Sequence, residues 1–327
     1  MTMTATASAH DHEDDIILSV EDLEVDYPSG RSGYTRAVAG VSFVVSRGET
    51  LGIVGESGCG KSTTARAVLQ LTRPSRGVVR FEGRDLTTLS HHEMRAVRRK
   101  LQVVLQDPIS SLNPRRKVRD IVGEGLSIWG IPDAGERVRK AMEVVGLDVD
   151  SVGDRLPGEF SGGQCQRISI ARALALEPEM LICDEPVSAL DVSVQAQIVN
   201  LLEDLKAQYG LTMIFVSHDL SVIRVISDRV MVMYLGKVCE IGPVMELFDN
   251  PRHPYTKTLL DALPVPDPDI ELDSVPQTGE VPSVIAPPSG CRFRTRCPHA
   301  ATLCEDVEPQ PTETSEGHVV SCHFPLA

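Results

Sequence analysis

Residues 55–62 constrain the chain most, because they read G-E-S-G-C-G-K-S and fit the pattern G-x-x-x-x-G-K-[ST]. An apolar run precedes them at residues 50–54, and a helical pattern follows at residues 63–71. In a strand–loop–helix unit of this kind, glycines let backbone N–H groups converge on phosphate, and the helix N-terminus adds its dipole. We therefore predict a phosphate-binding loop, the P-loop, made of Gly55, Glu56, Ser57, Gly58, Cys59, Gly60, Lys61, Ser62 and Thr63.

A second motif lies further along the chain, where residues 180–185 read M-L-I-C-D-E. An apolar strand that ends in two acids is the Walker B pattern of nucleotide hydrolases. We expect Asp184 and Ser62 to bind Mg²⁺ and Glu185 to polarise an attacking water as general base. Lys61 is expected to reach the β- and γ-phosphates. An acidic turn after a core strand is the alternative, and the P-loop upstream disfavours it.

Strand-like and helix-like segments alternate between residues 16 and 248, which predicts a mainly parallel sheet flanked by helices. The strand-like runs cover residues 78–81, 101–105, 180–183, 212–217 and 230–234. Between residues 118 and 176 only helical patterns occur. We therefore expect an α/β P-loop NTPase domain at residues 16–250, with an inserted helical subdomain at about residues 107–176. A disordered tail is expected at residues 1–15.

Composition limits the classes of partner. The net charge of −14 argues against a nucleic-acid-binding surface, which needs clustered Lys and Arg. No apolar run approaches the ~20 residues that span a bilayer. The N-terminus lacks a basic region followed by an apolar one, so we expect no secretory signal and a cytoplasmic protein. Any membrane association is expected to come through a partner.

The region at residues 251–327 differs from the rest, because most of the 22 prolines lie there. Residues 264–288 are expected to be an irregular linker, followed by a small Cys-rich extension with too few apolar residues to fold without a cross-link. Four thiolates suit either a [4Fe–4S] cluster or tetrahedral Zn²⁺, with free or disulfide-linked thiols as the alternative. The four cysteines are Cys291, Cys297, Cys304 and Cys322.

A third motif, S-G-G-Q at residues 161–164, precedes a helical pattern at residues 164–176. Together with the P-loop and the acidic pair, it makes the chain resemble an ATP-binding-cassette (ABC) ATPase. Gln106 resembles the family's Q-loop, residues 188–191 its D-loop and His218 its switch histidine. Tyr27 resembles the aromatic residue that stacks on adenine, with Tyr34 as the alternative. The residues that resemble the signature motif are Ser161, Gly162, Gly163 and Gln164.

The resemblance implies ATP and Mg²⁺ as cofactors, with Gln106 as a further Mg²⁺ ligand and with Glu185, His218 and Gln106 as catalytic residues. In the family, two cassettes pair head to tail. Each ATP lies between one subunit's P-loop and the signature motif of the other subunit. Ser161 and Gly163 are therefore expected to contact the partner's nucleotide.

The end of the chain resembles a subfamily. The run H-P-Y-T at residues 253–256 and the four-cysteine region resemble the C-terminal region of oligopeptide/dipeptide importer ATPases. This implies an ATPase that powers peptide import at the cytoplasmic face of the membrane. The implied partners are a second ATPase subunit (a paralogue or an identical copy), two permease subunits and, indirectly, a substrate-binding protein. Cluster-bearing members favour [4Fe–4S] at the cysteines. A nickel or glutathione importer and a redox-sensing ABC ATPase are the alternatives.

Overall fold

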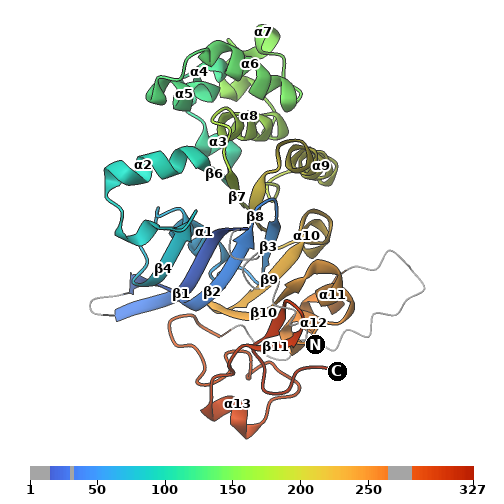
Figure 1. Cartoon of the computed structure of the whole chain (residues 1–327). Coiled ribbons are helices and arrows are strands. Elements are labelled where there is room, and N and C mark those ends of the chain that lie inside the picture. Colours follow the sequence, from blue (N-terminus) through green and yellow to red (C-terminus); the bar gives the residue numbers. More distant parts are fainter. Residues whose placement is uncertain (1–14, 30–32, 264–281) are drawn as a thin grey trace, which may run out of the picture.

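The computed structural model describes residues 15–29, 33–263 and 282–327. The tail expected at residues 1–15 lies outside the described part, except for Asp15. Most of the linker expected at residues 264–288 also lies outside it. Helices gather at the top of Figure 1, the sheets lie in the middle, and residues 282–327, the C-terminal segment, lie at the bottom. None of the helices in the described part is long and apolar enough to cross a membrane.

A parallel sheet in the order β9-β3-β8-β7-β6 forms the centre of the molecule. The sequence predicts all five strands, and β3 has the predicted bounds. Side chains alternate between two cores, because Leu181 and Cys183 enter one cluster while Met180 and Ile182 enter the other. The strands are β3 (Thr50–Val54), β6 (Leu101–Val104), β7 (Met180–Asp184), β8 (Thr212–Val216) and β9 (Arg229–Tyr234).

A separate antiparallel sheet, in the order β2-β1-β4-β5, departs from the mainly parallel sheet that the sequence predicts. The alternation of strand-like and helix-like segments does not reveal it, because its first two strands form one long hairpin. Its apolar face shares a core with α1 and α2. These elements are β1 (Ile16–Ser29), β2 (Gly33–Ser46), β4 (Arg76–Phe81), β5 (Arg84–Asp85), α1 (Lys61–Val68), the 3₁₀ turn Leu86–Thr88 and α2 (His91–Lys100).

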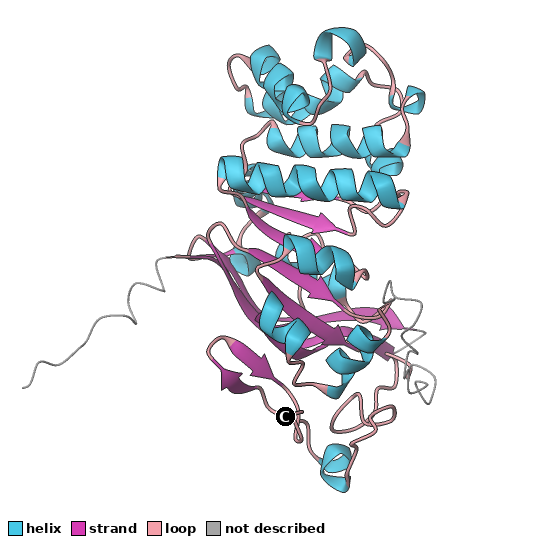
Figure 2. Cartoon of the chain, turned by 90° about the vertical axis from the view of Figure 1, so that its right-hand side faces the viewer, coloured by secondary structure: helices cyan, strands magenta, loops and turns pink. Residues whose placement is uncertain are grey.

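Only helices lie between β6 and β7, where the sequence predicts a helical insertion. Gly123 ends one helix and precedes the next, so the helical pattern at residues 118–129 forms two short helices. Figure 2 shows this helical layer stacked above the sheet. The helices are α3 (Pro108–Ser111), α4 (Val118–Val122), α5 (Glu124–Trp129), α6 (Ala134–Val144), α7 (Val149–Val152), the 3₁₀ turn Pro157–Glu159 and α8 (Gly162–Leu174).

The C-terminal segment continues the central sheet. Its strand β12 (His318–Val320) pairs antiparallel with β10 (Lys237–Pro243) and with β11 (Thr312–Ser315). The sequence predicts that this segment needs a cross-link to fold, whereas strand addition to β10 gives it hydrogen-bond partners and a share of an existing core. The remaining helices are α9 (Val192–Tyr209), α10 (Leu220–Ile226), α11 (Val244–Asp249), α12 (Pro254–Asp261) and α13 (Thr302–Asp306).

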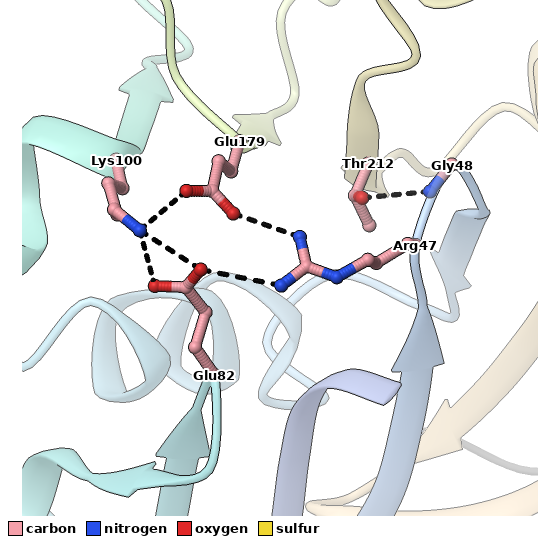
Figure 3. Close-up of polar contacts among 6 residues, drawn as sticks. All are labelled: Arg47, Gly48, Glu82, Lys100, Glu179 and Thr212. Atoms are coloured by element: carbon pink, nitrogen blue, oxygen red, sulfur yellow. Dashed lines mark hydrogen bonds and ion pairs between the residues drawn. The ribbon is translucent and has the colours of Figure 1, made fainter. Parts of the chain in front are cut away.

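A ring of four charged side chains ties the two sheets together at the amino ends of the parallel strands (Figure 3). Arg47 pairs with Glu179 at 2.9 Å and with Glu82 at 3.3 Å. Lys100 pairs with the same two carboxylates at 2.6 and 2.8 Å. Burial alone would raise the pKa of Glu179, but the hydrogen bonds from Lys100 and Arg47 lower it to about 2. The ring therefore stays charged at neutral pH, and it leaves the carboxyl ends of the strands open for other residues.

Candidate active site

The P-loop follows β3 at the carboxyl edge of the sheet, and two of its glycines lie against other strands. Gly55 has φ 148° and Gly60 has φ 107°, both in the region that favours glycine. A Cβ at Gly55 would lie 2.1 Å from the carbonyl oxygen of Met233, and one at Gly60 would lie 2.5 Å from that of Ala37. The close approach of β9 and β2 therefore requires glycine at both positions.

Lys61 begins α1 and is buried. Its ammonium donates to the carbonyl oxygens of Gly55 at 2.7 Å and Glu56 at 3.0 Å, so the P-loop folds around the lysine. The N-cap residue Gly60 provides no side-chain hydrogen bond, which leaves the first N–H groups of α1 to phosphate. Ser62 and Thr63 are half-buried in the first turn, and Ser57 is exposed. This is the geometry of an anion cradle.

Asp184 ends β7 and is 3% exposed. Burial raises its pKa, and a hydrogen bond with Ser62 opposes that shift. Arg66 lies 3.9 Å away, but Oδ1 of Asp184 has no hydrogen-bond partner among the described residues. A buried carboxylate oxygen without a partner, next to a serine hydroxyl, fits the hard oxygen ligands that Mg²⁺ prefers. Ser62 and Asp184 are therefore the residues that fit this ion.

Glu185 follows β7 with φ 50°, a conformation that costs energy in a residue other than glycine. Its N–H donates to the carbonyl of Val216 at 3.0 Å, which fixes the turn. Its carboxylate oxygen Oε2 accepts from Nε2 of Gln106 at 2.9 Å and lies 3.5 Å from Nδ1 of His218. Two residues that follow the neighbouring strands β6 and β8 thus converge on the Glu185 carboxylate at the end of β7. The positive φ of Glu185 is a strained backbone conformation of the kind that clusters at functional sites.

The S-G-G-Q motif lies at the start of α8. The Ser161 hydroxyl accepts from the Gln164 N–H at 3.4 Å, and the Gln164 side chain accepts from the Ser161 N–H at 3.0 Å. This reciprocal pair is a capping box. Ser161 is exposed, and a Cβ at Gly163 would lie 2.5 Å from Val194 of α9. The motif therefore presents an exposed helix N-terminus whose backbone packs closely on α9.

Both candidate adenine-stacking residues lie near the end of the β1–β2 hairpin. Tyr27 pairs with Thr35, and Tyr34 pairs with Pro28. Tyr27 is 37% exposed and Tyr34 73% exposed, so both rings are accessible. The carbonyl of Ala37, on the same hairpin, is the group that approaches Gly60. The hairpin end thus borders the P-loop.

The sequence gives no indication of two contacts between the P-loop and the end of the chain. The Tyr255 hydroxyl, on α12, accepts from the N–H of Glu56 at 2.9 Å. Arg296 donates to both carboxylate oxygens of Glu56 at 2.8 and 2.9 Å, across 240 positions of sequence. Tyr255 belongs to the H-P-Y-T run, which indicated only family resemblance. No periodicity or spacing pairs residues so far apart.

The four C-terminal cysteines belong to one region of the C-terminal segment. The N–H of Cys291 donates to the carbonyl of Cys304 at 2.8 Å. The neighbouring thiols Cys297 and Cys304 contribute to a raised pKa at Cys291, and all three contribute to a raised pKa at Cys322. Burial raises the pKa of Cys291 and Cys297 and raises that of Cys322 to about 11. Within the described ranges, no group of three or more His, Cys, Asp or Glu is placed to hold a metal ion.

Comparisons with known sequences divide the chain into two matched regions. Residues 38–188 match the family described as ABC transporter. Residues 239–304 match the family described as oligopeptide/dipeptide transporter, C-terminal region. The second match includes Tyr255 and Arg296, both of which contact Glu56 of the P-loop.

Two relatives match this chain over almost its whole length. A putative peptide import ATP-binding protein of Brucella ovis is 50% identical over 309 residues, covering 94% of this chain and 97% of that protein. The oligopeptide transport ATP-binding protein OppF of Salmonella typhimurium is 50% identical over 321 residues, covering 94% and 96%. The similarity therefore spans both the nucleotide-binding motifs and the C-terminal segment.

Solved structures agree with the fold. The cbiO1 structure of Clostridium perfringens, part of the ABC transporter complex cbiONQ, has a TM-score of 0.64 at 31% identity and covers 72% of this chain and 91% of that one. The dimeric ATP-binding cassette MJ0796, bound to ADP and Pi, has a TM-score of 0.63 at 28% identity, covering 69% and 98%. One description names an ABC transporter complex and the other an ATP-binding cassette.

Proposed function

We propose that this chain, which belongs to the ATP-binding proteins of ABC transporters in the oligopeptide/dipeptide branch, hydrolyses ATP to power peptide import. The observation that carries the catalytic part is the meeting of Gln106 and His218 on the Glu185 carboxylate, beside the P-loop and Asp184. The peptide cargo rests on the relatives, which are described as peptide import and oligopeptide transport ATP-binding proteins.

The proposed mechanism follows from the positions of the side chains. The P-loop N–H groups and Lys61 hold the phosphates in line. Glu185 accepts a proton from the attacking water as general base, while Gln106 and His218 hold its carboxylate in one orientation. Ser62 and Asp184, with Gln106 as a further ligand, would hold Mg²⁺, which would supply positive charge opposite the phosphates. Tyr27, or Tyr34 beside it, stacks on the adenine.

The exposed S-G-G-Q motif supports a second proposal, that two cassettes share each nucleotide. The N-terminus of α8 offers N–H groups and the Ser161 hydroxyl to an anion. Gly162 and Gly163 lie in its first turn, and Gln164 closes the capping box. In a head-to-tail pair, these groups contact the γ-phosphate held by the partner. MJ0796 is described as dimeric, which supports such pairing. The second cassette is a paralogue or an identical copy.

We also place the permease contact on the surface that follows Gln106, so that the chain associates with the cytoplasmic face of the membrane through two permease subunits. Ile109 on α3 is 60% exposed, so this surface offers a large apolar side chain three residues after Gln106. Arg172 of α8 donates to the carbonyl of Ser111 at 2.7 Å and so links α3 to the helix that carries the signature motif. A substrate-binding protein outside the membrane acts only through the permeases.

The transport function is tested by uptake of a labelled peptide into proteoliposomes that contain this chain, its partner cassette and the permease subunits. Uptake should require ATP. Lys61→Ala should abolish both uptake and ATP binding by the isolated chain, because it removes the buried cation of the phosphate cradle. Lys140→Ala, which removes an amine beside Tyr209, is the matched control and should change neither. ATP-independent uptake, or wild-type ATP affinity in Lys61→Ala, would contradict the assignment.

We further propose that Cys291, Cys297, Cys304 and Cys322 bind a [4Fe–4S] cluster, with a structural Zn²⁺ site as the alternative. The position of the four cysteines in one segment, with the N–H of Cys291 bonded to the carbonyl of Cys304 at 2.8 Å, supports this proposal. Binding requires the thiolates to move closer together, since the described residues contain no ready metal site. The proposed role is structural, because the segment has few apolar residues of its own.

Anaerobic purification tests the cluster. The protein should be brown and contain about four irons and four sulfides per chain. Replacing any one of the four cysteines with Ser should remove the colour and the iron. Cys165→Ala changes a buried cysteine near the signature motif and should leave the iron unchanged. One tightly bound zinc in colourless protein would establish the alternative, and metal-free protein with a folded C-terminal segment would contradict both.

A further inference from the structure

Glu56, in the second position of the P-loop, connects the nucleotide cradle to α12 and to the C-terminal segment. Its carbonyl oxygen accepts from the Lys61 ammonium at 3.0 Å. Its N–H donates to the Tyr255 hydroxyl at 2.9 Å. Its carboxylate accepts two hydrogen bonds from Arg296, at 2.8 and 2.9 Å. One residue thus connects the phosphate-binding lysine to two residues outside the matched cassette motifs.

The Arg296 side chain is fixed by its surroundings. It is 4% exposed, and it donates to the Tyr234 hydroxyl at 3.3 Å. Its guanidinium lies 5.7 Å from the Tyr234 ring centre and 5.9 Å from that of Phe293, distances at which cations interact with aromatic faces. The Tyr234 and Tyr255 rings are 4.7 Å apart. This aromatic cluster holds the cation at one place above the P-loop.

A carboxylate is an unusual charge to place in a loop that binds polyphosphate, because like charges repel across a partly buried site. The bidentate pair with Arg296 cancels the charge of Glu56 and fixes its direction. We infer that Arg296 is a positioning residue for nucleotide binding: the C-terminal segment neutralises the one acidic side chain of the P-loop and thereby sets its affinity for phosphates. This inference rests on the proposed binding of ATP.

Arg296→Gln tests the inference by leaving the Glu56 carboxylate without its cation. The Kd for ATP should rise roughly tenfold, because one unit charge at about 10 Å and an effective dielectric constant of about 20 accounts for such a factor. The Kd for ADP should rise less, since ADP carries less charge. Arg296→Lys should keep most of the affinity, because the charge remains although the bidentate geometry is lost. Isothermal titration of the full-length chain measures these values.

The double variant separates charge from folding. Glu56→Gln/Arg296→Gln should recover wild-type affinity, and Glu56→Gln alone should not weaken binding, although both break the same ion pair. If loosening of the C-terminal segment were the cause, all three variants would lose affinity equally, and the inference would be wrong. Arg294→Gln is the matched control, because Arg294 contacts Ser289 and Glu305 within the same segment. Wild-type affinity in Arg296→Gln would also overturn the inference, whereas a wild-type chain that binds no ATP would overturn the proposed function.

Discussion

Replacing Glu185 with Gln is expected to slow ATP hydrolysis by at least about 100-fold while leaving ATP binding intact. The amide is nearly isosteric but cannot accept the proton of the attacking water. The proposed phosphate contacts come from Lys61 and the P-loop, and among the described residues the hydrogen bonds of Lys61 do not involve the Glu185 side chain. Release of phosphate by the assembled transporter and the Kd for ATP of the isolated chain measure the two effects separately.

The same variant should accumulate paired cassettes when ATP is added, because closure follows nucleotide binding and reopening follows hydrolysis. Gel filtration with ATP and Mg²⁺ detects the pair. Glu177→Gln is a matched control. Glu177 lies just before the start of β7, at the opposite end of the strand from Glu185, and its exposed carboxylate pairs with Arg137. That control should hydrolyse ATP normally. Turnover close to wild type in Glu185→Gln would remove Glu185 from the catalytic role.

The P-loop, the acidic pair, Gln106 and His218 were predictable because each follows a strand whose apolar run is visible in the sequence. Glu185 directly follows β7, and His218 comes two residues after the end of β8. Parallel strands bring their carboxyl ends to one edge of the sheet. The sequence therefore predicts that these side chains lie at one edge of the sheet. That Gln106 contacts Glu185 depends on β6 being the neighbour of β7, which the structure shows.

The contacts of the C-terminal segment were not predictable in this way. Strand β12 is three residues long, and its partner β10 lies far upstream, so neither length nor periodicity marks it. The pairing of β12 with β10 fixes the position of the C-terminal segment, and the contact between Arg296 and Glu56 depends on that position. A short strand, a buried ion pair and an aromatic cluster stabilise the segment jointly, and each is visible only once the fold brings them together.

Glu240 is the residue whose loss should most destabilise the C-terminal segment. It is fully buried on β10 and accepts from the N–H groups of Arg252 at 2.7 Å and His253 at 2.9 Å. It also pairs with Nε2 of His318 on β12 at 2.7 Å. Glu240→Ala leaves two buried N–H groups and a buried imidazole without their acceptor, so we expect a loss of about 3–5 kcal/mol in the free energy of unfolding. Thermal unfolding and limited proteolysis within residues 282–327 measure it.

The pH dependence identifies the ion pair as the cause. The hydrogen bond to Glu240, more than that to Glu246, raises the pKa of His318. The stabilisation from the charged pair is therefore complete below the unfolded pKa of about 6.5 and is lost as the pH rises through the higher folded pKa. The difference between wild type and Glu240→Ala should be largest at acidic pH and shrink as the pH rises. Burial lowers the pKa of His253 to about 4, so this residue destabilises the fold as the pH falls toward that value. The charge of Glu240 opposes that shift, so Glu240→Ala should lose more stability from His253 than wild type does.

Glu246→Ala is the matched control for this pair. Its carboxylate lies 3.3 Å from Nδ1 of the same histidine but is 30% exposed, so its removal should cost less than about 1 kcal/mol. If Glu240→Ala and Glu246→Ala lost the same stability at every pH, the buried pair would not be what attaches β12 to the sheet. If Glu240→Ala exposes the C-terminal segment to protease, as expected, the affinity for ATP should fall as well, because the same segment carries Arg296, the cation that pairs with Glu56.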